Sequence, residues 1–191
     1  MRKFSIIIAT DTQNGIGRDG KLAWNIPEDM KFFREITSTV KKSHRQNAVI
    51  MGRKTWESIP EKNRPLPHRL NCILSSSYTA PVEKVAANTY GFPDMESCQA
   101  FIMKRKDLEN VFVIGGSYLY NLVLDEPCLE TIYLTQVFGD FNCDVFFSDI
   151  PSDFKKTFEG EKKTHKDIIY QFITYKKKRG FWDKIFKKRC K

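Results

Sequence analysis

The chain has 191 residues, of which 41% are hydrophobic and 13% aromatic, and its formal net charge is +9. These values favour one globular domain with a sizeable core. They exclude a helical membrane span, because no apolar run approaches the roughly 18–20 residues that a span needs. The charge is uneven, since residues 176–191 carry a net +8 and leave only +1 for the first 175 residues. Any recognition of nucleic acid would therefore depend on this tail alone.

The cysteines and histidines predict a reducing compartment and no metal site. The five cysteines are odd in number and never spaced as C-x-x-C, which favours free thiols, and the three histidines lie far apart in the sequence. The chain enters a strand-like run at Phe4 with no cleavage site before it, so no secretory signal is expected. We therefore expect a cytoplasmic protein, whose basic tail could also direct it to the nucleus or to a membrane.

Buried strands alternate with helices along most of the chain. Apolar, β-branched runs predict strands at 4–10, 48–51, 70–74, 111–114 and 131–137, with a weaker strand at 82–89. Helices are predicted at 27 to about 40, 94 to about 104, and from Gly52 and Ser117 onward. Strands at 154–158 and 167–175 have no helix between them and should form an antiparallel hairpin. The prediction is an α/β fold, with a mostly parallel central sheet flanked by helices and a C-terminal antiparallel hairpin.

The first predicted helix carries an acid among apolar residues. Pro27 suits the first turn of a helix, where its missing N–H costs nothing. Asp29, Met30, Phe33 and Ile36 then share one face, and we expect this face to turn inward because three of the four are apolar. A carboxylate so placed can recognise a cationic or amidine-like ring edge or manage a proton. The alternative is an acid that only caps the helix.

Several loops that follow strands have features of ligand-binding segments. Gly15, Gly17 and Gly20 match G-x-G-x-x-G by count, but the stretch does not open a helix directly and has no acidic residue at the required distance. Residues 52–55, Gly-Arg-Lys-Thr, could cradle a phosphate, and Gly115-Gly116 would let the backbone approach a flat or phosphorylated ligand. An ordinary mobile loop, a solvated basic turn and a tight turn are the respective alternatives. Because ligands bind beyond the carboxyl ends of parallel strands, we expect these loops to share one edge.

Arg69 lies at the start of a predicted strand. Apolar Ile59 and Leu66 precede it in a stiff, proline-rich loop. In such surroundings an arginine could hold a carboxylate with two hydrogen bonds, whereas its commoner role is a surface ion pair.

Together these segments resemble dihydrofolate reductase, in the family's order over residues 4 to about 175. The motifs that carry the resemblance are Ile7-Ile8-Ala9, Gly15-Ile16-Gly17, Leu22-Ala23-Trp24, Asp29-Met30-Lys31-Phe32-Phe33, residues 51–56, residues 59–66, Ile114-Gly115-Gly116 and residues 144–147. The loop at 60–66 and the long region at 138–165 are similar to the single-domain, animal form. The resemblance implies a monomer with a reductase domain at 1–175, followed by the tail at 176–191. It also implies NADPH-dependent reduction of 7,8-dihydrofolate to 5,6,7,8-tetrahydrofolate for one-carbon metabolism, with hydride to C6 and a proton to N5.

The resemblance assigns roles to individual residues. Asp29 would bind the pterin 2-amino group and N3, Trp24 and Thr135 would help order the water that delivers the proton, and Arg69 would clamp the glutamate carboxylate. The expected substrate-binding residues are Ile7, Ile8, Leu22, Asp29, Met30, Phe33, Ile59, Leu66, Arg69, Ile114 and Tyr120. The expected cofactor-binding residues are Ala9, Ile16, Gly17, Gly20, Lys21, Gly52, Arg53, Lys54, Thr55, Leu74, Ser75, Ser76, Gly115, Gly116, Ser117, Tyr118, Leu119 and Tyr120. The bond between Gly115 and Gly116 resembles the family's cis peptide, and no metal ligand is implied.

Two residues depart from the family pattern. Ala23 stands where proline is usual, which should loosen the loop before Trp24 without removing a catalytic group. Ser76 stands where many animal members carry an arginine against the 2′-phosphate of the cofactor. Arg53 and the serine hydroxyls would then have to take that phosphate.

The tail is not explained by the resemblance. Its apolar residues recur at helical spacing among Lys and Arg, at Phe181, Trp182, Ile185 and Phe186. This pattern suits an anionic membrane surface, an acidic partner or an import receptor, and the alternative is a solvated terminus. Two further readings of the whole chain remain open, a reductase of the pteridine or flavin pathways and a folate-fold binding protein that acts through the tail.

Overall fold

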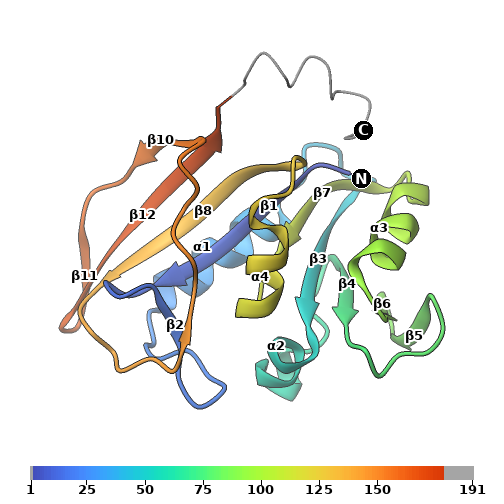
Figure 1. The fold of residues 1–191 in the computed structure, drawn as a ribbon, viewed down its shortest axis with the longest axis horizontal. Coiled ribbons are helices and arrows are strands. Elements are labelled where there is room, and N and C mark those ends of the chain that lie inside the picture. The colour runs from blue at the N-terminus through green and yellow to red at the C-terminus, as the bar shows by residue number, and fades with distance from the viewer. Residues whose placement is uncertain (1, 179–191) are drawn as a thin grey trace.

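A computed structural model of the protein describes residues 2–178. One sheet of ten strands forms its centre, in the order β10-β12-β8-β1-β7-β3-β4-β6-β5 with β11 paired to β12, and helices cover both faces (Figure 1). The strands are β1 (Phe4–Thr10), β3 (Gln46–Gly52), β4 (Arg69–Leu74), β5 (Glu83–Ala86), β6 (Thr89–Phe92), β7 (Leu108–Val113), β8 (Leu129–Phe138), β10 (Phe154–Glu159), β11 (Lys163–His165) and β12 (Ile168–Lys177). The helices are α1 (Pro27–Ser38), α2 (Arg53–Ser58), α3 (Met95–Lys104) and α4 (Ser117–Leu124), with a short 3-10 helix at Glu61–Asn63. A small second sheet pairs β2 (Gly15–Gly17) with β9 (Val145–Phe146).

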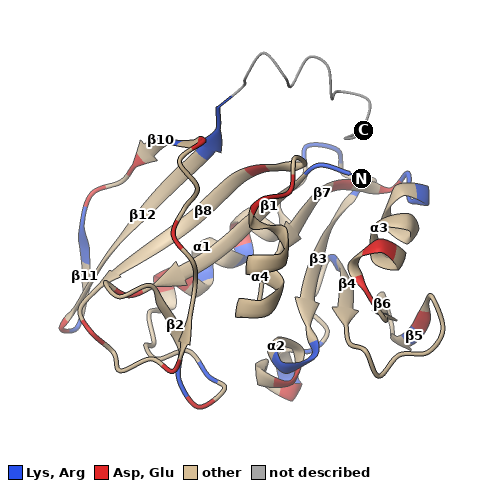
Figure 2. Ribbon diagram, viewed as in Figure 1, with Lys and Arg blue, Asp and Glu red and all other residues tan. Residues whose placement is uncertain are grey.

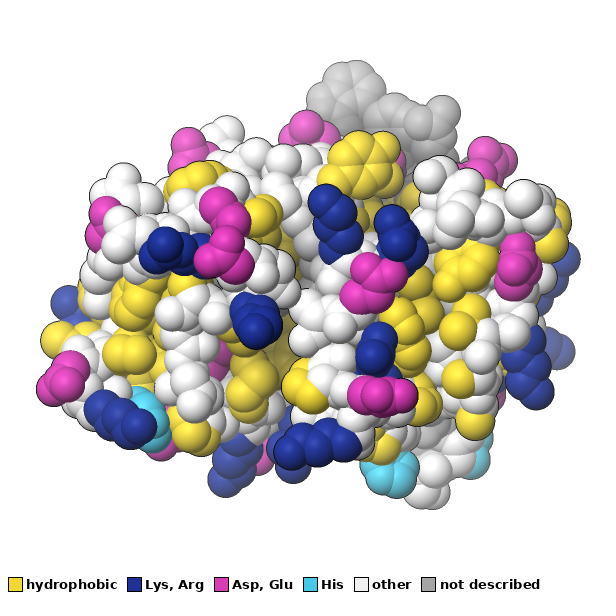
Figure 3. All heavy atoms as spheres, turned by 90° about the horizontal axis from the view of Figure 1, so that it is seen from below, with side chains coloured by type: hydrophobic (Ala, Val, Ile, Leu, Met, Phe, Trp, Pro, Cys, Tyr) yellow, Lys and Arg dark blue, Asp and Glu magenta, His cyan; other side chains and the backbone are white. Residues whose placement is uncertain are grey.

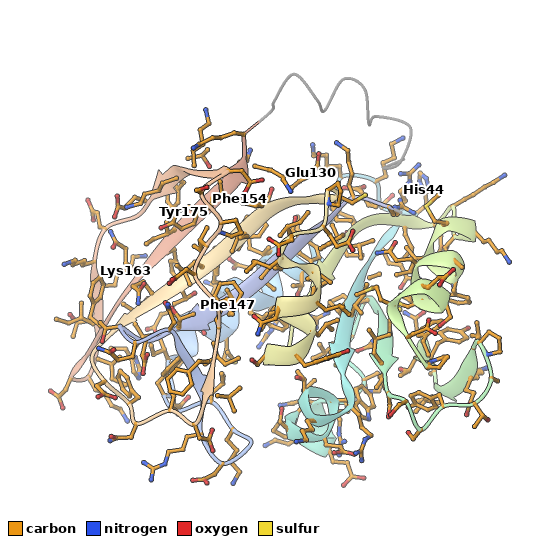
Figure 4. All side chains as sticks on the ribbon, in the orientation of Figure 1. His44, Glu130, Phe147, Phe154, Lys163 and Tyr175 are labelled. Atoms are coloured by element: carbon orange, nitrogen blue, oxygen red, sulfur yellow. The ribbon has the colours of Figure 1, made fainter. Side chains whose placement is uncertain are left out.

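The predicted fold class is confirmed. The adjacent strands β8, β1, β7, β3, β4 and β6 are all parallel. At one edge β12 pairs antiparallel with β8, and β10 and β11 pair antiparallel with β12. Phe154 and Tyr175, labelled in Figure 4, mark this hairpin. A mostly parallel sheet with a C-terminal antiparallel edge is what the order of strands and helices indicated.

Several predicted boundaries differ from the structure. The single strand expected at 82–89 is two antiparallel strands, β5 and β6, because Asn88 adopts a left-handed φ of 51° that reverses the chain. Helix α1 ends at Ser38 rather than near residue 40, since Thr39 is extended. Strand β12 continues to Lys177, where Lys176 pairs with Thr131, so the expected start of the tail at 176 falls inside the sheet.

The basic end of β12 is visible in Figure 2. The amphipathic pattern that begins at Phe181 lies outside the described residues. Its proposed partners therefore stay predictions.

The core lies on both faces of the central strands. Side chains alternate between the faces, so Ile50 and Val113 join the cluster under α3 and α4, while Val49, Met51 and Phe112 face the side of α1 and α2. This two-sided burial is why the strands read as continuous apolar runs. Cys72, Cys98 and Cys143 are free thiols, as expected. Cys128 is disulfide-bonded, so the expectation of free thiols is wrong for this residue.

Two features, a helix that could cross a membrane and a cluster of metal-ligating side chains, are absent from residues 2–178. None of the helices there is both long and apolar enough to cross a membrane. In the same part of the chain, no group of three or more His, Cys, Asp or Glu side chains is arranged to hold a metal ion.

Candidate active site

The loops that follow the parallel strands meet at one edge of the sheet, as predicted. Gly52 at the end of β3 is in register with Leu74 at the end of β4, and its N–H donates to the carbonyl of Gly115 beyond β7 at 2.7 Å. Helix α2 and strand β2 lie at this same lower edge in Figure 1. Figure 3 looks onto this edge and shows hydrophobic side chains in a hollow, bordered by Lys and Arg.

Asp29 is a buried carboxylate in the first turn of α1. It is 5% exposed, and its Oδ1 accepts a hydrogen bond of 2.6 Å from the hydroxyl of Thr135, at the centre of β8. Burial raises the pKa of Asp29 from an ordinary value of 3.8 to about 6, and the bond from Thr135 partly opposes this rise. A carboxyl with such a pKa can exist in either protonation state near neutral pH.

The apolar face of α1 is more open than predicted. Met30 is 39% exposed and Phe33 and Ile36 are half-buried, so the expectation of an inward-facing surface is wrong for Met30. Leu22 is also exposed, and the half-buried Ile59 and Leu66 belong to the same hydrophobic cluster as Ile36. Apolar side chains left open beside a buried acid are typical of a pocket for a largely apolar ligand.

Arg69 is buried at the far end of this wall. Although only 3% exposed, it contacts neutral groups, donating from Nη1 to the Thr37 hydroxyl at 2.7 Å and from Nε to the Pro67 carbonyl at 3.0 Å. Burial and, to a smaller extent, the nearby charge of Arg34 together lower its pKa to about 10. Among the described residues, the ion pairs do not include Arg69. A buried cation without an anion is costly, so this site is suited to an anionic ligand.

The two charged groups define an elongated site. Asp29 lies in the first turn of α1, whereas the Thr37 hydroxyl that contacts Arg69 lies in the last turn. Eight residues of helix separate Asp29 from Thr37, which is about 12 Å at 1.5 Å per residue. The geometry therefore suits a molecule with a hydrogen-bonding ring at one end, an apolar body, and a carboxylate at the other end.

The backbone at Gly115-Gly116 lies beside Gly52 at the same edge of the sheet. The peptide bond between them is cis, as the resemblance implied, and Gly115 has a φ of 128°, which side chains rarely adopt. A Cβ on Gly116 would lie 3.3 Å from the Thr55 hydroxyl. Helix α4 begins directly afterwards without a side-chain cap, so its first N–H groups are available to a ligand.

Trp24 is a buried aromatic residue shortly before α1, the helix that carries Asp29. Its ring is buried edge-on against Phe141, with 5.4 Å between centroids and 72° between planes. Its Nε1 is buried and has no hydrogen-bond partner among the described residues. Because buried N–H groups are nearly always paired, this atom marks a position for a water or a ligand atom.

Comparison with known proteins identifies the family. The family model for dihydrofolate reductase matches residues 3–177. The chain belongs to the dihydrofolate reductase family. It is 37% identical to a dihydrofolate reductase from Heliothis virescens over 180 residues, covering 92% of this chain and 97% of the relative. It is 34% identical to one from Aedes albopictus over 185 residues, covering 93% and 98%. A bifunctional dihydrofolate reductase-thymidylate synthase from Glycine max is 36% identical over 178 residues, which is 91% of this chain and 33% of that protein.

Members of the dihydrofolate reductase family use a nicotinamide cofactor, and the second half of the site fits one. Gly52 and Gly116 present bare backbone to a flat ring, and a Cβ on Gly52 would have only backbone atoms near it, at 3.8 Å and beyond. Thr55 is half-buried beside Gly115 and Gly116. The Tyr120 hydroxyl donates to the Ile7 carbonyl at 2.9 Å, and Phe147, labelled in Figure 4, packs edge-on against the Tyr120 ring.

The basic and serine residues expected near the cofactor lie at this edge of the dihydrofolate reductase fold. The register between β3 and β4 places Arg53 and Ser75 directly after two paired residues. Arg53 also forms an exposed ion pair of 3.2 Å with Glu57. Ser75 and Ser77 share a hydroxyl–hydroxyl hydrogen bond of 2.7 Å, while Ser76 is exposed. In Figure 2 positive charge gathers at the start of α2.

The remaining predicted residues divide into those near the open surface and those in the core. Ile8 and Leu119 are buried in the main hydrophobic cluster, so their side chains face the core rather than the open surface of the site. Tyr118 is 82% exposed. Half-buried or exposed positions at the same edge are occupied by Ala9, Ile16, Gly20, Lys21, Lys54, Leu74, Ile114 and Ser117, while Gly17 is buried in β2.

Ala23, which stands where the family usually has proline, is partly buried in the hydrophobic cluster of Trp24.

Sequence reasoning missed a second buried acid, Asp11, at the end of β1. The available signal was an aspartate at the end of a predicted strand, followed by Asn14-Gly15, because both Asp and Asn-Gly favour turns.

Proposed function

We propose that this enzyme reduces 7,8-dihydrofolate to 5,6,7,8-tetrahydrofolate with NADPH. The residues of the candidate active site would bind both molecules and support the reaction. One observation carries the proposal. A buried carboxylate, Asp29, and a buried guanidinium without an anionic partner, Arg69, stand at opposite ends of an apolar wall on α1. Dihydrofolate has the matching order of groups, a pterin that presents a 2-amino group and N3, a benzoyl ring and a glutamate.

Asp29 has two tasks in this proposal. Its carboxylate accepts hydrogen bonds from the pterin 2-amino group and N3, which fixes the ring orientation. Its bond from Thr135 holds it in place and limits the rise of its pKa to about 6. Because a carboxylate engaged there does not reach pterin N5, the proton arrives through water, for which the free Nε1 of Trp24 provides a donor.

The rest of the substrate is held by shape and charge. Leu22, Met30 and Phe33 line the ring-binding part of the site, and Ile59 and Leu66 contact the benzoyl ring. The guanidinium of Arg69 binds the glutamate carboxylate with two hydrogen bonds, and its contacts with Thr37 and Pro67 fix its orientation.

NADPH, when bound, supplies the hydride that reaches pterin C6. The backbone at Gly115-Gly116 and the start of α4 would hold its nicotinamide and pyrophosphate groups. Arg53, Ser75 and Ser76 take the 2′-phosphate, which favours NADPH over NADH. Because Arg53 also forms an ion pair with Glu57, the preference for NADPH depends on the serine hydroxyls as well.

The test is the loss of absorbance at 340 nm when dihydrofolate is mixed with the purified protein and NADPH or NADH. We expect turnover with NADPH, a kcat/KM for NADH lower by at least about tenfold, and a collapse of turnover in Asp29→Asn. Arg53→Gln should narrow the preference for NADPH while leaving the KM for dihydrofolate unchanged. A folded wild-type protein without turnover would overturn the proposed reaction, and equal use of both cofactors would overturn the assignment of the 2′-phosphate site.

A further inference from the structure

Asp11 is the second acid that the described structure buries almost completely, and the proposed reaction does not use it. It is 1% exposed and follows the last residue of β1. Its Oδ1 accepts from the N–H groups of Gln13 at 2.9 Å and Gly15 at 2.7 Å, and its Oδ2 accepts from the N–H of Phe141 at 3.3 Å. One carboxylate therefore joins the loop at 11–15 to the loop at 139–143.

A second contact joins the same two loops. The thiol of Cys143 lies beside the carboxylate of Asp11, since a Cβ on Gly15 would approach both groups, and Cys143 packs directly on the backbone of Gly15. A Cβ placed on Gly15 would lie 2.4 Å from the Cβ of Cys143, so no side chain fits at Gly15 unless the loops separate. The carboxylate thus sits inside a closely packed junction.

The hydrogen bonds indicate that this carboxylate is ionised. Burial alone would raise the pKa of Asp11, but the N–H groups of Gly15, Gln13 and Phe141 outweigh burial and leave the pKa below its usual value. An ionised carboxylate accepts on both oxygens, whereas an amide of the same shape accepts on only one. Asparagine at this position would bring its NH₂ group against one of the N–H donors.

The junction extends to the proposed active site through Phe141. The N–H of Phe141 is held by Asp11, and its ring packs edge-on against Trp24 at 5.4 Å. On the other side, Gly15 begins β2, which pairs with β9. Asp11 therefore holds both Phe141, whose ring contacts Trp24, and Gly15, the first residue of β2.

We infer that Asp11 is a positioning residue, which fixes Phe141 and thereby the indole of Trp24 for proton delivery. The inference rests on the proposed function of Trp24. A carboxylate that served only to close the turn at 11–15 would need only the bonds to Gln13 and Gly15. The bond to Phe141, 130 residues away, and the thiol of Cys143 are what favour a role in the site.

The experiment compares Asp11→Asn with Asp19→Asn, the same chemical change on an exposed side chain of the neighbouring turn. Asp19 contacts the loop at 144 through its backbone N–H, which the substitution retains. A third protein, Phe141→Leu, keeps the backbone bond to Asp11 and removes the ring that contacts Trp24. For each folded protein, stopped flow gives the single-turnover rate of hydride transfer, and fluorescence quenching gives the Kd of dihydrofolate.

We expect the hydride-transfer rate to fall at least about fivefold in Asp11→Asn and Phe141→Leu, with the Kd of dihydrofolate within twofold of wild type. Asp19→Asn should match wild type in both quantities. A rate within twofold of wild type in either folded test variant would overturn the inference, and so would an equal loss in Asp19→Asn. If Asp11→Asn does not fold, Phe141→Leu decides alone. A wild-type protein that does not reduce dihydrofolate would overturn the proposed function instead, so the two failures are distinguishable.

Discussion

The hydroxyl of Thr135 donates to Asp29 across 2.6 Å, and this bond joins the centre of the sheet to the first turn of α1. Both side chains are buried. Burial and this hydrogen bond act on the carboxyl in opposite directions, and burial prevails, with a resulting pKa of about 6. The protein thus holds an acid whose charge can change under mild conditions, at a place where little solvent reaches it.

Thr135→Val should raise the pKa of Asp29. Valine has nearly the same shape but cannot donate, so the ionised carboxylate loses a hydrogen bond that favours it. Since such bonds contribute about 1.5 kcal/mol or more, the titration midpoint should move from near pH 6 to about pH 7. The carboxyl resonance of Asp29, assigned by its absence in Asp29→Asn, gives the midpoint by NMR titration. A midpoint that falls or stays constant would contradict the assignment of this bond.

Asp29→Asn should stabilise the protein in neutral solution while it removes activity. Folding raises the pKa from 3.8 to about 6, so the folded state favours the protonated carboxyl. Its favourable contribution is complete below about pH 4 and is lost as the pH rises through 6. Asparagine carries no charge at any pH. The unfolding free energy of the variant relative to wild type should therefore grow by about 1–3 kcal/mol between pH 4 and pH 8.

Urea denaturation at several pH values measures this difference. The comparison is between the two proteins at each pH, so titrations that they share cancel. A difference that does not change with pH would show that Asp29 titrates alike in the folded and unfolded chains.

Arg69→Gln should weaken binding only of substrates that carry a glutamate. The guanidinium would lose charge-assisted hydrogen bonds to the carboxylate, which corresponds to a KM for dihydrofolate about 10- to 100-fold higher. The matched control is 7,8-dihydropteroate, which has the pterin and benzoyl groups without the glutamate. Wild type and Arg69→Gln should reduce this control with similar kcat/KM. If the variant loses as much activity toward dihydropteroate, Arg69 acts through the fold rather than as a clamp.

Local sequence patterns account for most of the fold. The runs around Ile50 and Val113 predicted buried parallel strands because both faces of the sheet are covered, and the structure gives both residues no exposure. Pro27 and the spacing of the apolar residues likewise placed Asp29 in the first turn of a helix, where it is buried. The turn at Asn88 escaped prediction, because a single residue in a left-handed conformation divides one apolar stretch into two strands.

The site could be predicted only in part, because its decisive contacts join residues far apart in the chain. Thr135 lies 106 residues from Asp29, and Phe141 lies 130 residues from Asp11. Neither pairing leaves a periodic or spacing signal, so Thr135 was found through the family resemblance and Asp11 was missed. Periodicity also predicted that Met30 faces inward, although it is exposed. The spacing of apolar residues cannot distinguish a buried core from an open apolar pocket.

Tyr120→Phe should destabilise the protein, whereas Tyr118→Phe should not. The two tyrosines lie on α4, but Tyr120 is 5% exposed and donates to the Ile7 carbonyl at 2.9 Å, while Tyr118 is 82% exposed. Burial raises the pKa of Tyr120, so its hydroxyl remains protonated and able to donate. Removing it leaves the Ile7 carbonyl without this donor, at a cost of about 1–3 kcal/mol. Thermal and urea unfolding of the two variants measure the difference. Equal stability of Tyr120→Phe and wild type would mean that Ile7 finds another donor, and Tyr120 would then be free to serve a ligand rather than the sheet.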